Sequence, residues 1–248
     1  MSDLEDYLNQ LIRKKNIFRE QSFENLKQVL VNLKIKKPNK LISITGTNGK
    51  GSTAEILSRV LAKNKYEVGL LTSPHLVKFN ERIRINNENI DDIALLNCLE
   101  EVDKLKDSKE LNFYQIIAAA AFLFFSKKKL DVWILEVGLG GRLDPANYFD
   151  ADISVITKIA LDHENILGKG VENIGREKAG IFRSLRSSAN SISSIVWLPS
   201  RSYLSQNSSM WFSASSICRM SKSSLYSRSC VHLSKRNSTP FSFAISTT

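Results

Sequence analysis

The chain has 248 residues, of which 42% are hydrophobic, so it is long enough for one large or two small domains with a real core. Its formal net charge is +10, but nine of its 35 Lys and Arg residues lie from Lys178 onward, while all 25 acidic residues lie at or before Glu177. The first 177 residues are therefore nearly neutral and have no basic stripe interleaved with aromatic residues, which argues against nucleic-acid binding.

Cysteine usage and hydropathy indicate where the protein works. Cys98, Cys218 and Cys230 lack metal-ligand spacing and are too few for a disulfide framework, which fits a reducing cytoplasm. The N-terminus is acidic and polar and has no apolar core of a signal peptide. The longest apolar run, residues 116–125, is shorter than the roughly 20 residues that span a bilayer. We therefore expect a cytoplasmic protein with no membrane partner.

The first predicted elements form a strand–turn–helix unit. Apolar residues at helical spacing after Ser22 predict an amphipathic helix over residues 23–33, and Pro38 follows its end. Residues 41–45 predict a buried strand, and a glycine-rich turn leads from it into a helical pattern. Four apolar residues of that helix are expected to face inward: Ile56, Leu57, Val60 and Leu61.

The glycine-rich turn, residues 45–53, is the most informative stretch of the chain. Glycine lets the backbone approach an anion closely, the helix start adds partial positive charge, and Lys50 adds a full one. The spacing departs from the common phosphate loop, because only two residues separate Gly46 from Gly49 and Gly51 separates Lys50 from Ser52. An ordinary strand-to-helix turn is the alternative. We expect a nucleotide to bind at Thr47, Asn48, Gly49, Lys50, Gly51 and Ser52.

The following pattern alternates strands and helices. Strands are expected at residues 68–72, 132–137 and 153–157, a hairpin at 79–90, and helices from Asp91, over 112–128 and over 171–178. The helix from Asp91 is expected to carry Ile93, Leu96 and Leu99 on its apolar face. Glu136 ends a buried strand, where open α/β sheets place ligand chemistry. The order predicts a doubly wound α/β nucleotide domain with a mainly parallel sheet.

Six strings in these elements closely resemble the folylpolyglutamate synthase and dihydrofolate synthase family of the Mur ligase superfamily. They cover residues 45–53, 71–77, 79–83, 135–144, 161–163 and 176–181. The resemblance implies a phosphate-loop ATPase domain and an ATP-dependent ligase that adds L-glutamate to dihydropteroate or a folate through an acyl phosphate. It also implies ATP and two Mg²⁺ ions as cofactors, and we expect a monomer.

The resemblance also implies roles for individual residues. Ser73 and Glu136 would hold one Mg²⁺, His163 and Glu136 a second, and Lys50, His163 and Lys178 would be catalytic, with Lys178 carbamylated near the second metal. A loop with Gly140, Gly141, Arg142 and Asp144 would border the pterin substrate.

Each of these residues has a plainer interpretation. Ser73 would be a turn residue, Glu136 half of an ion pair, His163 a loop histidine, Lys178 a solvated lysine, and the glycines a connector. Pro145 stands where the family has alanine and restricts the backbone of Asp144.

The character of the sequence changes after Arg183. Of the 65 residues from Ser184, 23 are serine, and there is no glycine, acidic residue or sustained period. We interpret residues 1–183 as a partial ATP-binding domain and residues 184–248 as a frameshifted tail that is not natively folded. The family's C-terminal domain would then be absent, and little or no turnover is expected.

Two other functions are considered. One is a non-catalytic nucleotide-binding remnant of a disrupted gene. The other is a cell-wall Mur ligase, which residues 72–75 and 79–82 disfavour.

Overall fold

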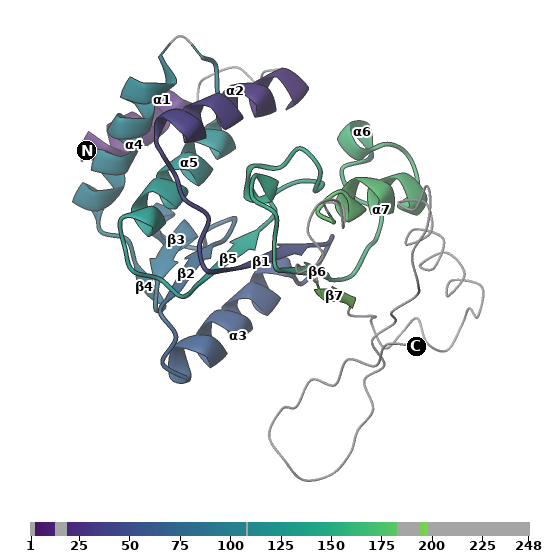
Figure 1. The fold of residues 1–248 in the computed structure, drawn as a ribbon. Coiled ribbons are helices and arrows are strands. Elements are labelled where there is room, and N and C mark those ends of the chain that lie inside the picture. The colour runs from purple at the N-terminus through teal and green to yellow at the C-terminus, as the bar shows by residue number, and fades with distance from the viewer. Residues whose placement is uncertain (1–2, 13–18, 108, 183–193, 198–248) are drawn as a thin grey trace. The chain divides into compact units, whose positions relative to one another are not determined.

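The computed structural model describes residues 3–12, 19–107, 109–182 and 194–197, all within one compact unit. A sheet of seven strands in the order β4-β3-β2-β5-β1-β6-β7 runs through this described part (Figure 1). The strands are β1 (Lys40–Thr45), β2 (Val68–Leu71), β3 (Ile83–Ile85), β4 (Glu88–Asn89), β5 (Val132–Glu136), β6 (Ile153–Ile156) and β7 (Ser194–Trp197). The five strands from β2 to β7 in this order are parallel. Strand β3 pairs antiparallel with β2, and β4 pairs antiparallel with β3. The predicted α/β class with a mainly parallel sheet is confirmed.

Helices cover both faces of the sheet (Figure 1). The helices are α1 (Asp3–Ile12), α2 (Arg19–Asn32), α3 (Lys50–Lys63), α4 (Asp92–Lys106), α5 (Phe113–Ser126), α6 (Glu164–Leu167) and α7 (Val171–Ala179), with 3₁₀ turns η1 (Phe79–Arg82) and η2 (Pro145–Asn147). The group of α1, α2, α4 and α5 lies on one face, and α3 lies on the other. No described helix is long and apolar enough to cross a membrane. Helix α1 was not predicted, although Leu4, Leu8 and Leu11 recur at helical spacing and are buried.

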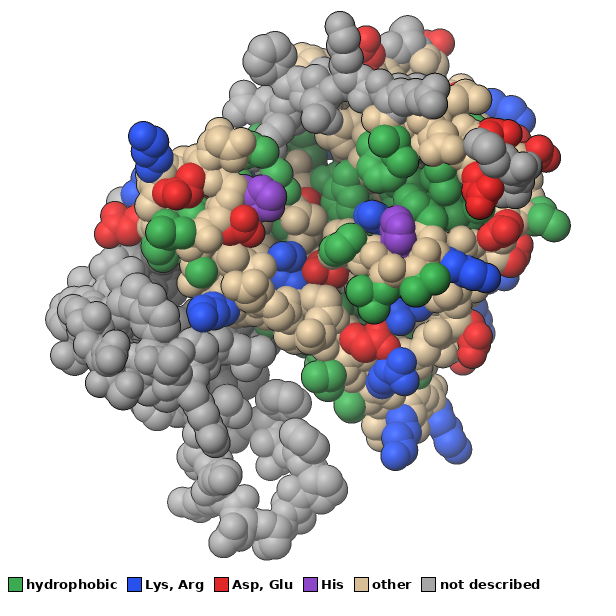
Figure 2. Space-filling view, turned by 180° about the vertical axis from the view of Figure 1, so that it is seen from behind, with side chains coloured by type: hydrophobic (Ala, Val, Ile, Leu, Met, Phe, Trp, Pro, Cys, Tyr) green, Lys and Arg blue, Asp and Glu red, His purple; other side chains and the backbone are tan. Residues whose placement is uncertain are grey.

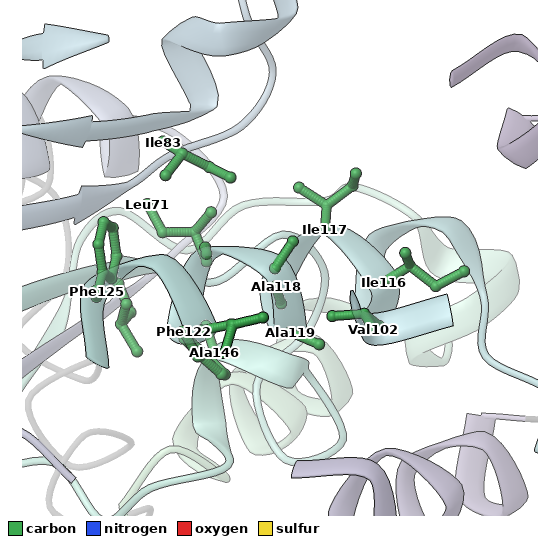
Figure 3. Close-up of a cluster of buried hydrophobic side chains, with 14 of the residues drawn as sticks. Leu71, Ile83, Val102, Ile116, Ile117, Ala118, Ala119, Phe122, Phe125 and Ala146 are labelled. Carbon is green, nitrogen blue, oxygen red and sulfur yellow. The ribbon is translucent and has the colours of Figure 1, made fainter. Parts of the chain in front are cut away.

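The main core is organised around α5, which is apolar on all sides. Ten of its 14 residues are buried, and Phe122 and Phe125 belong to the same buried cluster as Leu71 of β2 and Ile83 of β3 (Figure 3). A helix that is buried all round draws its stability from packing. Its start is fixed by a capping box, in which Asn112 and Gln115 each accept a hydrogen bond from the other's backbone amide, at 2.9 and 3.0 Å.

The inward face predicted for α3 is partly wrong. Ile56 and Val60 are 62% and 52% exposed, and the buried positions of this helix are Ala54 and Ser58. The helix begins at Lys50, inside the glycine-rich turn of residues 45–53, which we call the phosphate loop, so this loop sets which row of side chains meets the sheet. An ion pair of 2.6 Å between Glu55 and Arg84 of β3 holds that orientation.

A similar displacement occurs in α4. Ile93 is 74% exposed, whereas Leu95, Cys98, Leu99 and Val102 are buried. The cap at Asp91 is confirmed, because its carboxylate accepts a hydrogen bond of 2.8 Å from the amide of Ala94. The helix was therefore predicted correctly, and of its predicted apolar residues Leu96 and Leu99 pack in the core, whereas Ile93 does not.

Within the predicted tail, the structure describes only β7, which pairs in parallel with β6. The rest of residues 184–248 lies outside the described residues, so the frameshift interpretation and the domain division stay predictions.

Elsewhere on the surface, Leu76 and Val77 are 93% and 83% exposed. On the side seen in Figure 2, hydrophobic side chains gather beside a hollow, with acidic and basic side chains around it.

We predict that Phe122→Ala lowers the free energy of unfolding by about 3–5 kcal/mol, because it removes a fully buried ring stacked on Trp133 and leaves a cavity. Urea denaturation of the full chain measures this loss. Phe124→Ala on the same helix is the control and should cost less, because Phe124 is only partly buried. Equal losses in the two variants would contradict the assigned core.

Candidate functional site

The phosphate loop is braced by the segment that follows β6. Thr47 donates its backbone amide to the carbonyl oxygen of Lys158 at 2.6 Å, and Thr157 Oγ1 lies 2.8 Å from the Asn48 carbonyl oxygen. At Gly46, with φ of 150°, a Cβ atom would lie 1.8 Å from Thr157 Oγ1. Only glycine therefore fits at this position, because any side chain would collide with Thr157. The contacts with Thr157 and Lys158 fix the conformation of the loop.

The loop leads into the start of α3, where backbone amides point out of the end of the helix. Gly49 is the N-cap residue with φ of 84°, and no side chain caps this helix. The amide of Gly51 hydrogen-bonds to the Glu136 carboxylate, and the first amides of α3 carry the positive end of the helix dipole. Lys50 Nζ donates to the carbonyl oxygen of Thr47 at 3.2 Å, which folds the lysine back over the loop. This arrangement favours an anion site over an ordinary turn.

Glu136 lies at the centre of the site. It ends β5 and is only 3% exposed, and its Oε2 accepts a hydrogen bond of 3.0 Å from the Ser73 amide. A Cβ atom on Gly51 would lie 3.3 Å from the same oxygen, so α3 begins against this carboxylate. The structure thus brings Gly51, Ser73 and Glu136 together, as the sequence predicts.

The pKa of Glu136 reflects these neighbours. Burial raises the pKa of its carboxyl group, whereas the Ser73 amide and the positive charges of Lys50 and Arg82 lower it. The carboxylate is thus poorly hydrated, and the charges of two cations favour its ionised form.

Tyr114 is a member of the site that sequence reasoning missed. Its hydroxyl group donates to the backbone carbonyl oxygen of Glu136 at 2.9 Å. Burial raises the pKa of Tyr114 well above its usual value, and a hydrogen bond with Ser73 opposes this. Its ring also closes the space at Gly138, where a Cβ atom would lie 3.0 Å from it. Tyr114 lies in the first turn of the apolar helix α5, so the sequence does not distinguish it from a core residue.

Lys178 is buried against the phosphate loop, which contradicts its interpretation as a solvated lysine. Its side chain belongs to α7, the residue is 5% exposed, and Nζ donates to the carbonyl oxygen of Gly46 at 2.7 Å. Burial, with help from the positive charge of Lys50, lowers the pKa of Lys178 to about 8. A buried amine of this kind is partly neutral near physiological pH and therefore a better nucleophile than an exposed lysine.

The contact recorded for the His163 side chain is with Asp162 and not with Glu136. The side chain is 54% exposed, the backbone φ of His163 is 50°, and its Nε2 lies 3.6 Å from Asp162 Oδ1. Among the described residues there is no group of three or more His, Cys, Asp and Glu side chains that could hold a metal. The second metal site therefore stays a prediction.

Asp144 shapes the glycine-rich loop after β5. It is 3% exposed, and its carboxylate accepts hydrogen bonds of 2.9–3.0 Å from the backbone amides of Gly138, Leu139 and Ala146. Its backbone is extended, with φ of −79° and ψ of 139°, which is the conformation that a following proline favours. Pro145 is thus compatible with the loop, and Asp144 acts as its internal brace.

The other predicted substrate residues pack between β1 and α7. The carbonyl oxygen of Gly140 accepts a hydrogen bond of 2.7 Å from Thr45 Oγ1, and a Cβ atom on Gly141 would lie 2.7 Å from the carbonyl oxygen of Lys178. Arg142 points outward, with 57% of its side chain exposed. It lines a pocket of about 340 Å³ together with Gln21, Glu24 and Leu143.

Comparisons with known proteins agree with this geometry. Residues 44–209 match the model of the Mur ligase middle domain. A dihydrofolate synthase/folylpolyglutamate synthase of Buchnera aphidicola is 42% identical over 177 residues, which are 71% of this chain and 42% of that protein.

Solved structures are similar too. E. coli FolC in complex with DHPP and ADP matches 74% of this chain and 44% of its own, with a TM-score of 0.70 and 40% identity. A bifunctional folylpolyglutamate synthase/dihydrofolate synthase with Mn, AMPPNP and L-glutamate bound matches 75% of this chain and 45% of its own, with a TM-score of 0.69 and 38% identity. The chain therefore spans less than half the length of these relatives.

The buried amine of Lys178 leads to a prediction about pH. The folded protein loses this proton near pH 8, whereas an unfolded lysine loses it near 10.5. Between these values the unfolded state binds more protons, so the free energy of unfolding rises with pH, by up to about 3 kcal/mol. Below pH 8 this contribution is absent.

Denaturation of wild type and Lys178→Met between pH 7 and pH 10.5 measures the effect as the difference between the two proteins. The exposed Lys169→Met is the matched control and should follow wild type. A difference between wild type and Lys178→Met that does not change with pH would contradict the assigned burial.

Proposed function

Because this chain belongs to the Mur ligase family through its middle domain, we propose that it is the ATP-binding part of a ligase that joins L-glutamate to dihydropteroate or to a folate. The observation that carries this proposal is the contact between the phosphate loop and buried Glu136, which lies beside Gly51 and Ser73. The name of the relative and the ligands bound in the two solved structures supply the substrate classes.

The proposed reaction has two steps. An oxygen of the substrate carboxylate bonds to the γ-phosphorus of ATP while the bond to the β,γ-bridging oxygen breaks, so that ADP leaves and an acyl phosphate forms. The glutamate amine then bonds to the acyl carbon and gives up a proton, and phosphate leaves. In both steps the chain's contribution is charge balance and positioning, from Lys50 and the first amides of α3.

The ends of β2 and β5 fit one magnesium ion. Mg²⁺ takes oxygen ligands and is usually held by one or two carboxylates together with substrate phosphates. Ser73 and Glu136 provide a hydroxyl and a buried carboxylate in one place, joined by the hydrogen bond from the Ser73 amide. Bound there, Mg²⁺ would neutralise charge on the phosphate oxygens. The second ion, at His163 and Glu136, rests on the family resemblance.

Lys178 is proposed to be carbamylated. In that modification the ammonium group first loses one proton, and the neutral amine then bonds to the carbon of CO₂ and releases a second proton, so that a cation becomes an anion. The pKa of about 8 supports the proposal, because a larger share of the amine is neutral than in an exposed lysine.

The pocket between α2 and the glycine-rich loop is proposed to take the pterin. Its lining residues include Arg142 and Leu143 of the predicted substrate loop and Gln21 and Glu24 of α2. A volume of about 340 Å³ lies at the low end of the range for small-molecule pockets. Gly140, Gly141 and Asp144 would act by shaping this loop.

We further propose a cytoplasmic monomer that acts on small molecules. The cell-wall alternative is not favoured, because the relatives that the chain matches are named as folate enzymes. A nucleotide-binding remnant would bind ATP but not the pterin substrate, whereas a working ligase binds both. Binding of ATP and binding of dihydropteroate are therefore tested separately.

We predict that MgATP raises the thermal midpoint of the purified chain, because a ligand that binds only the native state stabilises it, by about 2.7 kcal/mol at 100 times the dissociation constant. Lys50→Ala should abolish most of the shift. Lys63→Ala, an exposed lysine at the other end of α3, is the control and should keep it. Equal shifts in all three proteins would contradict the assigned phosphate site.

We also predict that dihydropteroate raises the midpoint further when Mg-AMPPNP is present, whereas a cell-wall nucleotide peptide does not. Differential scanning fluorimetry measures both shifts at matched ligand concentrations. A shift with the nucleotide peptide would favour the cell-wall alternative. A shift with Mg-AMPPNP alone would support a nucleotide-binding remnant.

A further inference from the structure

Arg82 is a half-buried cation with no acidic partner among the residues that the structure describes. The one hydrogen bond recorded from its side chain there runs from Nε to His75 Nδ1, at 2.9 Å. Burial lowers the pKa of Arg82, while the charge of Glu136 raises it. Arginine nevertheless stays protonated, so a full positive charge is held in a poorly hydrated place. Such a charge is costly unless an anion compensates it.

Aromatic rings fix the plane of this guanidinium group. Its central carbon lies 5.1 Å from the centroid of the Phe79 ring and 6.0 Å from that of Phe113, and the His75 ring packs on Phe79 at 5.4 Å. Stacking holds a guanidinium by its faces and leaves its edge available. Because Nε is used by His75, the edge that remains is the pair of terminal Nη groups.

The backbone brings Arg82 to the end of β2, and its charge interacts with that of Glu136. The carbonyl oxygen of Arg82 accepts a hydrogen bond of 2.9 Å from the amide of Thr72, which precedes Ser73 in the chain. The turn before Arg82 is closed by Glu81, whose carboxylate accepts hydrogen bonds of 2.7–3.1 Å from the amides of Leu76, Val77 and Lys78. The position of Arg82 is therefore set by its own segment and by the end of β2.

We propose that Arg82 binds the carboxylate of the acid substrate, which is the group that receives the phosphoryl group. This inference rests on the proposed function. The substrate carboxylate must approach both Glu136 and the phosphates of ATP, and all three are negative, so a cation is needed to hold it there. The phosphates have Lys50 and the amides of α3, whereas Arg82 presents two parallel N–H donors that match a planar carboxylate.

The test compares dihydropteroate with its carboxamide, which has the same pterin and ring but no negative charge. Both are titrated calorimetrically into the full chain with Mg-AMPPNP present. Wild type should bind the acid at least about tenfold more tightly than the amide. Arg82→Gln should remove this preference while it binds the amide as wild type does, because only the contact with the carboxylate is lost.

Two further variants keep the test decisive. Arg82→Lys retains a charge but not the two-pronged donor, and it should lose most of the preference even if Arg82→Gln does not fold. Lys78→Gln removes an exposed cation from the same turn and should keep the preference. The thermal shift with Mg-AMPPNP establishes that each variant is folded.

Retention of the acid preference in folded Arg82→Gln or Arg82→Lys would overturn the inference and leave the proposed function standing. Failure of wild type to bind either pterin, with the Mg-AMPPNP shift intact, would overturn both the inference and the proposed substrate.

Discussion

The burial of one carboxylate, that of Glu136, sets the conditions for everything around it. Glu136 ends β5, the central strand of the sheet, and parallel pairing places it level with Ile44 at the end of β1. A charge in this position needs hydrogen bonds and opposite charges nearby, because desolvation alone disfavours it. The Ser73 amide and the cations Lys50 and Arg82 provide these, and they come from three different segments of the chain.

The three cations of the site lie in different surroundings. Lys50 is turned back over the phosphate loop by the Thr47 carbonyl group, and Lys178 supports that loop from behind through the carbonyl group of Gly46. Arg82 lies within an aromatic cluster, and its positive charge acts on Glu136. Excess positive charge of this kind is typical of sites that gather anionic substrates, since the charges that they balance arrive with the ligands.

The loop geometry also determines how the helices pack. The phosphate loop must keep Gly46 against Thr157, so α3 starts at a fixed place and angle, and Ile56 and Val60 are turned to the surface. Likewise, the backbone amides after β5 converge on Asp144, so this residue braces the substrate loop from within. At α3, therefore, a constraint at the site overrides the pattern of local hydrophobicity.

The sequence by itself determined the α/β class, the strands β1, β2, β5 and β6, the phosphate loop and the neighbourhood of Ser73 and Glu136. These follow from local periodicity, glycine positions and the rule that parallel strands end at one edge of a sheet. Only the tertiary structure decided the buried faces of α3 and α4, the pairing of Lys178 with Gly46, and the places of Tyr114 and Arg82. These depend on contacts between segments far apart in the chain, and a burial or a charge environment created by such contacts leaves no periodic trace in the sequence.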